Sequence, residues 1–343
     1  MLSYFPVPYP DELWYGVITR YHVHSGGICW SDTLKGLFGC EKAHPCIGNL
    51  LPNETMQQIA TQMPQDRIDL KDLALNHSLL SFQMRFQPGE KKREYLKHFI
   101  AGENMQPKFL IYTKKLREER PLRYCPVCCK EEIAKYGEPY WHTEHQIWLL
   151  PLCPVHGCHL IESSRKRSMP IGQQLLLPPL EPDRPDYTSS EIEQSLTESI
   201  HYLYQLPYDE EPAVDTDNLS RAVENAKLLE QGSIKRRAWD TQRLYDLLIE
   251  VFGESVVTDY FGRHITRAHA LRLRKYEIYA TEEYVMLMVS LRIKDDVLFA
   301  RIAIPLALEE QMRKLSLSGS TFTKPRAARV LGIREDQLLP YAK

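Results

Sequence analysis

The chain has 343 residues, of which 43% are hydrophobic and 26% charged, and its formal net charge is −2. This length and balance are typical of a soluble globular protein with two or three domains. No apolar run reaches the roughly 18 residues that a membrane-spanning helix needs, and the N-terminus lacks the basic and apolar regions of a secretory signal, so we expect a cytoplasmic protein.

The small net charge hides three segments of different sign. Residues 1–180 carry 21 Lys or Arg and 18 Asp or Glu, residues 181–212 carry one Arg and nine acids, and residues 213–343 again carry 21 and 18. Two mildly basic parts therefore flank an acidic one. The totals are weak evidence for nucleic acid, because phosphate binding depends on clustered cations.

Three short amphipathic helices are predicted in the first part of the chain. The first follows Asp11, a candidate N-cap, and ends near residue 24. The second follows Ser31 and ends at Gly39, and the third begins after Asn53. Three short helices predict a small domain of helix-turn-helix type that could read DNA, although an ordinary helical domain would show the same pattern.

Four metal-type side chains lie in the same region: Cys29, Cys40, His44 and Cys46. Their spacing is irregular, and only one gap is short. We therefore interpret the cysteines as buried or partly buried thiols rather than as a second metal site.

Basic residues precede the cysteine-rich part of the chain. Residues 90–101 read as a helix with Lys91, Lys92 and Arg93 in its first turn, where the helix dipole disfavours cations. This placement indicates either an anionic partner or a solvated face. Further cations follow, and we interpret them as candidate contacts to DNA phosphates, although neighbouring acids dilute them. These are Lys114, Lys115 and Arg117.

Two knuckles between residues 125 and 156 carry the strongest signal. Cys125 and Cys128 stand in CPVC, Cys153 and His156 stand in CPVH, and 24 residues separate the two pairs. Two such pairs supply the four soft ligands of tetrahedral zinc, so we predict a structural Zn²⁺ site with no open position for chemistry. Two disulfides or free thiols are the alternatives. Other donors nearby could replace one of the four: Cys129, Cys158, His159, His142 and His145.

Aromatic residues crowd the segment between the knuckles. These are Tyr136, Tyr140, Trp141 and Trp148. Aromatic side chains can stack on bases, but we interpret these as the small core that a zinc module needs.

An acidic, proline-rich segment follows the knuckles. Residues 170–190 contain five prolines, and the acidic character continues to residue 212. This composition predicts an extended linker, within which residues 189–205 have the periodicity of a helix that could pack back on a domain or dock a basic partner.

The last part of the chain is predicted to be helical and DNA-binding. Two amphipathic helices, over residues 220–231 and 240–252, flank a basic turn, and a second basic tract spans residues 263–275. Residues 325–341 have the proline start, small residues and glycine turn of a helix-turn-helix unit, with a plain αα-corner as the alternative. Candidate DNA contacts in these segments are Lys235, Arg236, Arg237, Arg267, Arg272, Arg274, Lys275, Arg326, Arg329, Arg334 and Gln337.

Motifs of common enzyme classes are absent. The sequence contains no phosphate-binding P-loop, no nucleophile elbow, no HExxH zinc-protease motif and no dinucleotide fingerprint. We therefore predict a protein that is not an enzyme and binds no small-molecule substrate.

Two stretches resemble one protein family. LRYCPVC followed by YGEPYWHTEHQIWLLPLCPVHGCHL, and the opening FPVPYPDELWYGVITRY, are similar to the TniQ/TnsD family of bacterial transposon target-selection proteins. The resemblance covers the chain to about Leu160. It implies binding to a double-stranded attachment site, association with the nucleoid, and recruitment of a TnsC-like AAA+ ATPase and, through it, of the transposase.

The resemblance leaves two branches open. The opening motif favours the TnsD branch, which reads DNA, whereas the length favours the TniQ branch, an adaptor for an RNA-guided CRISPR effector complex. A zinc-containing transcription regulator is a third possibility.

We therefore expect a mainly α fold with an inserted structural zinc-finger module. The expected parts are an N-terminal helix-turn-helix-like domain over residues 1–105, which with the zinc module over 106–180 forms a TniQ domain, a linker over 181–212, and a DNA-binding domain over 213–343.

Overall fold

In the computed structural model, part of the chain is described in detail. The described residues are 2, 4–39, 50–63, 68–85, 89–103, 121–166, 177–208 and 241–255. The helix expected over residues 220–231, the basic tract over 263–275 and the helix pair over 325–341 lie outside them.

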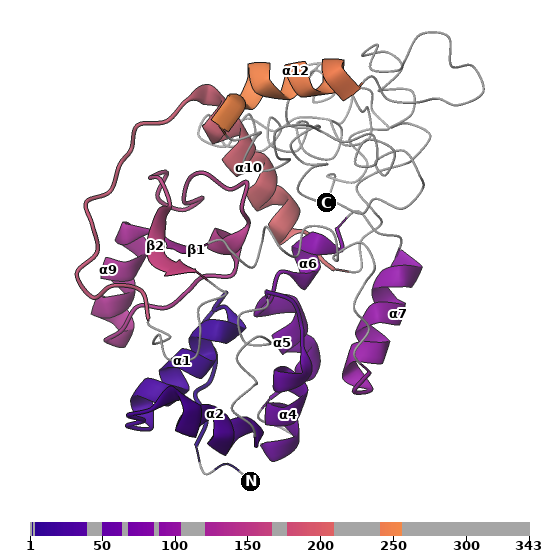
Figure 1. Cartoon of the computed structure of the whole chain (residues 1–343), viewed down its shortest axis with the longest axis vertical. Coiled ribbons are helices and arrows are strands. Elements are labelled where there is room, and N and C mark those ends of the chain that lie inside the picture. Colours follow the sequence, from indigo (N-terminus) through magenta and orange to yellow (C-terminus); the bar gives the residue numbers. More distant parts are fainter. Residues whose placement is uncertain are drawn as a thin grey trace, which may run out of the picture.

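The described residues between 4 and 103, which we call the helical region, form mostly helices. They are α1 (Trp14–His24), α2 (Trp30–Phe38), α4 (Glu54–Gln62), α5 (Leu70–Asn76), α6 (Leu80–Gln83) and α7 (Gly89–Ile100) (Figure 1). Their apolar stripes meet in one core, in which Ile18, Leu34 and Met56 are completely buried. Burial of these side chains is the main favourable contribution to folding here.

The helix starts are only partly as predicted. Asn53 caps α4, because its side chain accepts a hydrogen bond from the second backbone N–H of the helix. The predicted caps Asp11 and Ser31 are wrong. α1 follows Leu13, and α2 begins at Trp30, one residue before the expected serine. Asp11 adopts φ 58°, and its carboxylate accepts hydrogen bonds from side chains far away in sequence, so tertiary contacts override its capping preference.

Residues 121–166 form a compact unit that we call the cysteine module. It contains β1 (Pro121–Tyr124), α9 (Pro126–Tyr136), the 3₁₀ helix η3 (Glu144–Gln146) and β2 (Ile161–Lys166). The two strands pair antiparallel, with Tyr124 opposite Ile161, and the register is irregular at the far end. Tyr140 and Trp141 are buried, which agrees with the predicted aromatic core.

The cysteine module is joined to the helical region by buried polar contacts. The backbone N–H of Leu13 donates to the carbonyl of Trp141 at 2.7 Å. Arg20 on α1 forms ion pairs with Glu12 at 2.7 Å and with Glu138, just after α9, at 2.8 Å. A buried charge is costly unless it is paired, so these contacts fix how the two parts meet.

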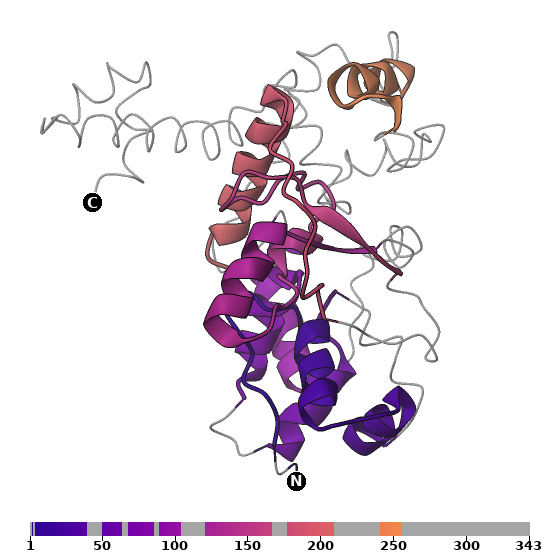
Figure 2. The same ribbon diagram turned by 90° about the vertical axis from the view of Figure 1, so that its left-hand side faces the viewer.

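Residues 177–208, which we call the strap, pack back on this unit. The strap ends in α10 (Glu191–Gln205), which begins with a reciprocal capping box between Ser190 and Glu193. Leu196, Ile200 and Leu203 on α10 are buried in the main core. Figures 1 and 2 place α10 beyond the cysteine module, at the opposite end of the described structure from α2.

The end of the strap is held by two buried cations. Arg85 donates to the carbonyl of Pro207 at 2.7 Å and also to that of Leu206. Lys92 donates to the carbonyl of Tyr208 at 3.1 Å. These bonds satisfy carbonyls that would otherwise remain unpaired after the helix.

A last helix, α12 (Thr241–Phe252), is as predicted and ends at Gly253 with φ 83°. Within the described residues the fold is mainly helical, with one two-stranded sheet, which confirms the mainly α part of the predicted fold class. In the same residues no helix combines the length and apolar character required to cross a membrane.

Candidate metal centre

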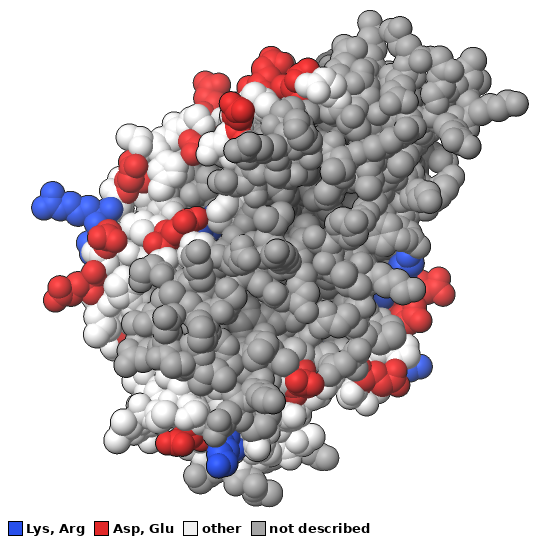
Figure 3. All heavy atoms as spheres, in the orientation of Figure 1, with Lys and Arg blue, Asp and Glu red and all other residues white. Residues whose placement is uncertain are grey.

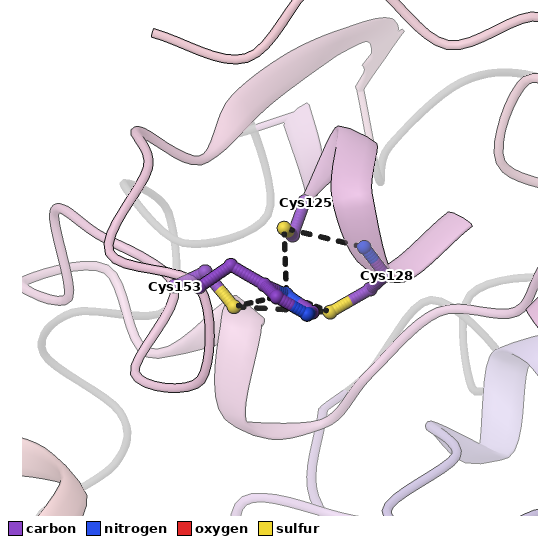
Figure 4. Close-up of side chains that lie close together, drawn as sticks. Cys125, Cys128 and Cys153 are labelled. Carbon is purple, nitrogen blue, oxygen red and sulfur yellow. Dashed lines mark hydrogen bonds between the residues drawn. The ribbon is translucent and has the colours of Figure 1, made fainter. Parts of the chain in front are cut away.

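Four predicted donors converge inside the cysteine module (Figure 4). Cys125 is the N-cap of α9 and Cys128 lies in the first turn of that helix. Cys153 and His156 lie on the turn before β2, near the end of the module in sequence. Pro126 starts α9 at the position where its missing N–H costs nothing, and this places both cysteines of the first knuckle on one side.

Each knuckle is held by short-range hydrogen bonds. In the first knuckle the backbone N–H of Cys128 points at the sulfur of Cys125, at 3.4 Å. In the second knuckle the N–H of Gly157 donates to the carbonyl of Cys153 at 2.8 Å, and the glycine adopts φ 66°, a conformation that a residue with a Cβ rarely takes. These bonds help to set the directions of the donor side chains in both knuckles.

The donor spacing fits a tetrahedral zinc ion. Zn–S bonds of about 2.3 Å and Zn–N bonds of about 2.0 Å at tetrahedral angles place two sulfurs about 3.8 Å apart and a sulfur and nitrogen about 3.5 Å apart. The sulfurs of Cys128 and Cys153 are 3.7 Å apart. The Nδ1 atom of His156 lies 3.5 Å, 3.3 Å and 3.5 Å from the three sulfurs. The three cysteines are also buried.

A carboxylate orients the histidine from outside. The Nε2 atom of His156 lies 3.2 Å from a carboxylate oxygen of Glu131 on α9. A carboxylate at Nε2 favours the tautomer with its proton there, which leaves the Nδ1 lone pair facing the sulfurs. Glu131 is not among the residues predicted from sequence. Its position on α9, one turn beyond Cys128, is the feature that could have indicated its place beside the cluster.

Of the alternative donors, His145 is buried outside the four-donor cluster, with no hydrogen-bond partner at its Nδ1 atom among the described residues, whereas His142 has other partners and Cys158 lies beside the cluster. His142 sits between Asp11, at 3.2 Å, and Glu132, at 2.5 Å. Cys128, Glu132 and His142 also come within metal-binding reach of one another, but the Nε2 atom of His142 is already engaged by Glu132. Cys158 remains as a buried thiol beside Cys125.

Two other alternative donors, Cys129 and His159, face elsewhere. Cys129 is buried in the main core, against the helical region. The Nε2 atom of His159 lies 2.5 Å from the carbonyl of Thr188 on the strap. Neither side chain belongs to the four-donor cluster.

A cavity of about 540 Å³ lies between the cysteine module, the helical region and the end of α10. Its polar lining includes Asp11, His142, Glu144, His145 and His201. Burial alone would lower the pKa of His142, but hydrogen bonds to Asp11 and Glu132 raise it to about 10. Glu144 accepts from His201 at 2.8 Å, so most charges of this cavity are paired internally.

The predicted DNA contacts cannot be placed on this surface, because they all lie outside the described residues. They are Lys114, Lys115, Arg117, Lys235, Arg236, Arg237, Arg267, Arg272, Arg274, Lys275, Arg326, Arg329, Arg334 and Gln337. On the face shown in Figure 3 the described residues carry scattered acidic side chains with a few Lys or Arg between them. That part of the face has the charge of an ordinary solvated surface.

The structure tests two expectations about the N-terminal cations and thiols. Lys92, read from sequence as facing either an anion or solvent, is completely buried and donates to a backbone carbonyl. The expectation of a buried or partly buried thiol is wrong for Cys29, which is exposed. The other members of that irregular group, Cys40, His44 and Cys46, lie outside the described residues.

The described residues thus define a mainly helical domain with an embedded cluster of three cysteines and one histidine that could hold a metal ion. Comparison with known families identifies the domain: residues 3–160 match the TniQ family. The match covers a little less than half of the chain, and the four donors lie within the matched residues.

A relative of known class supports the same assignment. The chain is 26% identical over 181 residues to the Transposon Tn7 transposition protein TnsD of Escherichia coli. The similarity covers 50% of this chain and 35% of that protein, so the chain matches about a third of the relative's length.

Proposed function

We propose that this protein selects the target site of a bacterial transposon. In this proposal it binds double-stranded DNA at an attachment site and recruits an AAA+ ATPase regulator of the TnsC type, which brings the transposase, and it catalyses no step itself. The observation that carries the proposal is the TniQ domain with its similarity to a Tn7 transposition protein.

Zinc is the metal that we propose for the four-donor cluster. Cys125, Cys128, Cys153 and His156 supply all four positions of a tetrahedral site, so the ion would have no open position for a substrate. Its contribution would be to the fold, because it would cross-link the start of α9 to the turn before β2. The spacing of the donors and their burial support this assignment.

We further propose that DNA is contacted by the basic segments around residues 114–117, 235–237 and 263–275 and by the helix pair over 325–341. The first three segments contain clustered Lys and Arg residues, and clustered cations are what phosphates require. Within the helix pair, Arg334 and Gln337 would face base edges, and Arg326 and Arg329 would approach the backbone.

An electrophoretic mobility shift series tests direct DNA reading. Chromosomal fragments would be titrated with the full chain at rising salt, with and without the ATPase partner. A target selector that reads DNA should shift and footprint a defined fragment, with an affinity that falls steeply as salt rises.

Two other outcomes would favour a different function. Binding to an effector complex or to the ATPase without any preference among duplexes would favour the adaptor role. A dimer on a palindromic site, without ATPase recruitment, would instead favour a transcription regulator.

A further inference from the structure

A fifth cysteine borders the four-donor cluster. Cys158 is completely buried, and its sulfur lies 3.4 Å from that of Cys125. Within the cluster itself, the sulfurs of Cys128 and Cys153 are 3.7 Å apart. Cys158 is therefore as close to one donor as these two donors are to each other.

Cys158 is not one of the four donors in the described structure. Donor atoms of Cys125, Cys128, Cys153 and His156 lie within 4.8 Å of one another, and the Cys158 sulfur is not part of that set. It is adjacent to the set on the Cys125 side. If the Cys125 sulfur were removed, the position that it occupied would lie 3.4 Å from the Cys158 sulfur.

The turn that carries Cys158 can adjust without disturbing the core. The carbonyl of Cys158 accepts from the N–H of Cys153 at 2.8 Å, so the thiol is anchored beside the second knuckle. Gly157 precedes it, with no atom within 4 Å of the space that a Cβ would occupy. Val155, at the tip of the turn, is 75% exposed. A small shift of this turn therefore disturbs little packing.

We propose that Cys158 is a reserve metal ligand that replaces Cys125 when Cys125 is lost. This inference rests on the proposal that the cluster binds zinc. On binding, the Cys158 thiol releases its proton to solvent and supplies a thiolate, the same ligand type as the one it replaces. The site then keeps three thiolates and one imidazole, so the coordination number and charge are unchanged.

The geometry predicts an asymmetry among the ligands. The Cys128 sulfur lies 3.7 Å from that of Cys153 and 3.3 Å from the Nδ1 atom of His156, and both of these are already ligands. A further donor within reach of Cys128, His142, is held between Asp11 and Glu132. If Cys128 is lost, no neighbouring side chain should therefore replace it in the way that Cys158 replaces Cys125.

Cys129 provides a matched control for the test. It is a buried cysteine next in sequence to a ligand, but it packs in the main core rather than beside the four donors. Its removal should therefore leave the choice of ligand unaffected.

Zinc content per chain, measured by elemental analysis after gel filtration of the full chain, tests the inference. Wild type, Cys158→Ala and Cys125→Ala should each retain one equivalent of zinc, with the more conservative Cys125→Ser behaving like Cys125→Ala. Cys128→Ala and the double variant Cys125→Ala/Cys158→Ala should lose it, whereas Cys125→Ala/Cys129→Ala should retain it.

Cobalt(II) substitution gives a second readout. The sulfur-to-metal charge-transfer absorption of Cys125→Ala should match the three-thiolate intensity of wild type, and it should disappear in Cys125→Ala/Cys158→Ala. Loss of metal in both Cys125 variants, or equal retention by Cys125→Ala with and without Cys158, would overturn the inference. A wild-type chain that binds no zinc would overturn the metal proposal together with it.

Discussion

At the residue scale, Cys153 tests whether the fold depends on the proposed metal. Its sulfur is completely buried among donors from α9 and its own turn, and without a metal this group of thiols has only weak hydrogen bonds to hold it. Binding of a structural zinc ion contributes folding free energy directly, on the order of 10 kcal/mol in small zinc domains.

Cys153→Ala should therefore remove the metal and unfold the cysteine module rather than delete one interaction. The measurement is zinc content combined with thermal unfolding followed by circular dichroism. Cys129→Ala, a buried cysteine outside the cluster, should keep the metal and lose only a modest part of its stability. A folded Cys153→Ala protein without metal, with an unchanged melting temperature, would show that the ion is dispensable for folding.

Lys92 makes a different residue-scale prediction. It is completely buried, and its ammonium group donates to the carbonyl of Tyr208 at the end of the strap. Lys92→Met keeps the length of the side chain but removes the donor, so it should lower the free energy of unfolding by about 1–3 kcal/mol. Urea denaturation at fixed pH measures this difference.

The neighbouring Lys91 provides the matched control for that experiment, because it is exposed on the same turn of α7. Lys91→Met should change the free energy of unfolding by less than about 0.5 kcal/mol. If both variants unfold at the same urea concentration, the hydrogen bond between Lys92 and the strap contributes nothing to stability.

At the scale of elements, His142 joins the segment before α1 to the cysteine module. Burial disfavours its charge, but the carboxylates of Asp11 and Glu132 raise its pKa to about 10, so the imidazolium persists at neutral pH. The ordinary value of the unfolded chain is about 6.5. The stabilisation is thus fully present below about pH 6.5 and is lost as the pH rises toward 10.

The difference in unfolding free energy between wild type and His142→Gln should therefore shrink steadily between about pH 6.5 and 9.5. Chemical denaturation at several pH values, with zinc in excess throughout, measures it. Substitution of His98 by Gln is a suitable control for the loss of a histidine, because His98 is about a third exposed and pairs with acids near it on the surface. A difference that is constant with pH would mean that His142 is neutral in the folded protein.

The elements differ in how far sequence can predict them. The helices over residues 54–62, 89–100, 191–205 and 241–252 follow from apolar periodicity and glycine stops, because those signals are local. The knuckles are also predictable, since the two residues of each pair lie within one turn. The packing of the strap is not, because Arg85 and Lys92 meet carbonyls more than 100 residues away. The prediction of Asp11 as a cap is wrong for the same reason.

At the scale of the whole molecule, the described fold and the proposed DNA contacts occupy different segments of the chain. The TniQ domain, with its cluster and strap, forms most of the part that the structure describes, and the described surface in Figure 3 is not strongly basic. DNA binding is proposed for segments outside the described residues, at 114–117, 235–237, 263–275 and 325–341. Base reading and phosphate binding should then be separable by mutation in the full chain, because only base contacts carry sequence information.

Arg334→Ala should weaken binding to the specific duplex by about 1–3 kcal/mol while leaving binding to a random duplex unchanged, because it removes a base contact. The triple variant Lys235→Gln/Arg236→Gln/Arg237→Gln should weaken both duplexes alike and reduce the slope of log affinity against log salt by about 0.9 for each phosphate that is no longer neutralised. Fluorescence anisotropy titrations on both duplexes at several salt concentrations separate the two effects. An Arg334→Ala variant that binds both duplexes more weakly by the same factor would make this arginine a phosphate contact, and an unchanged affinity would mean that the helix does not touch DNA.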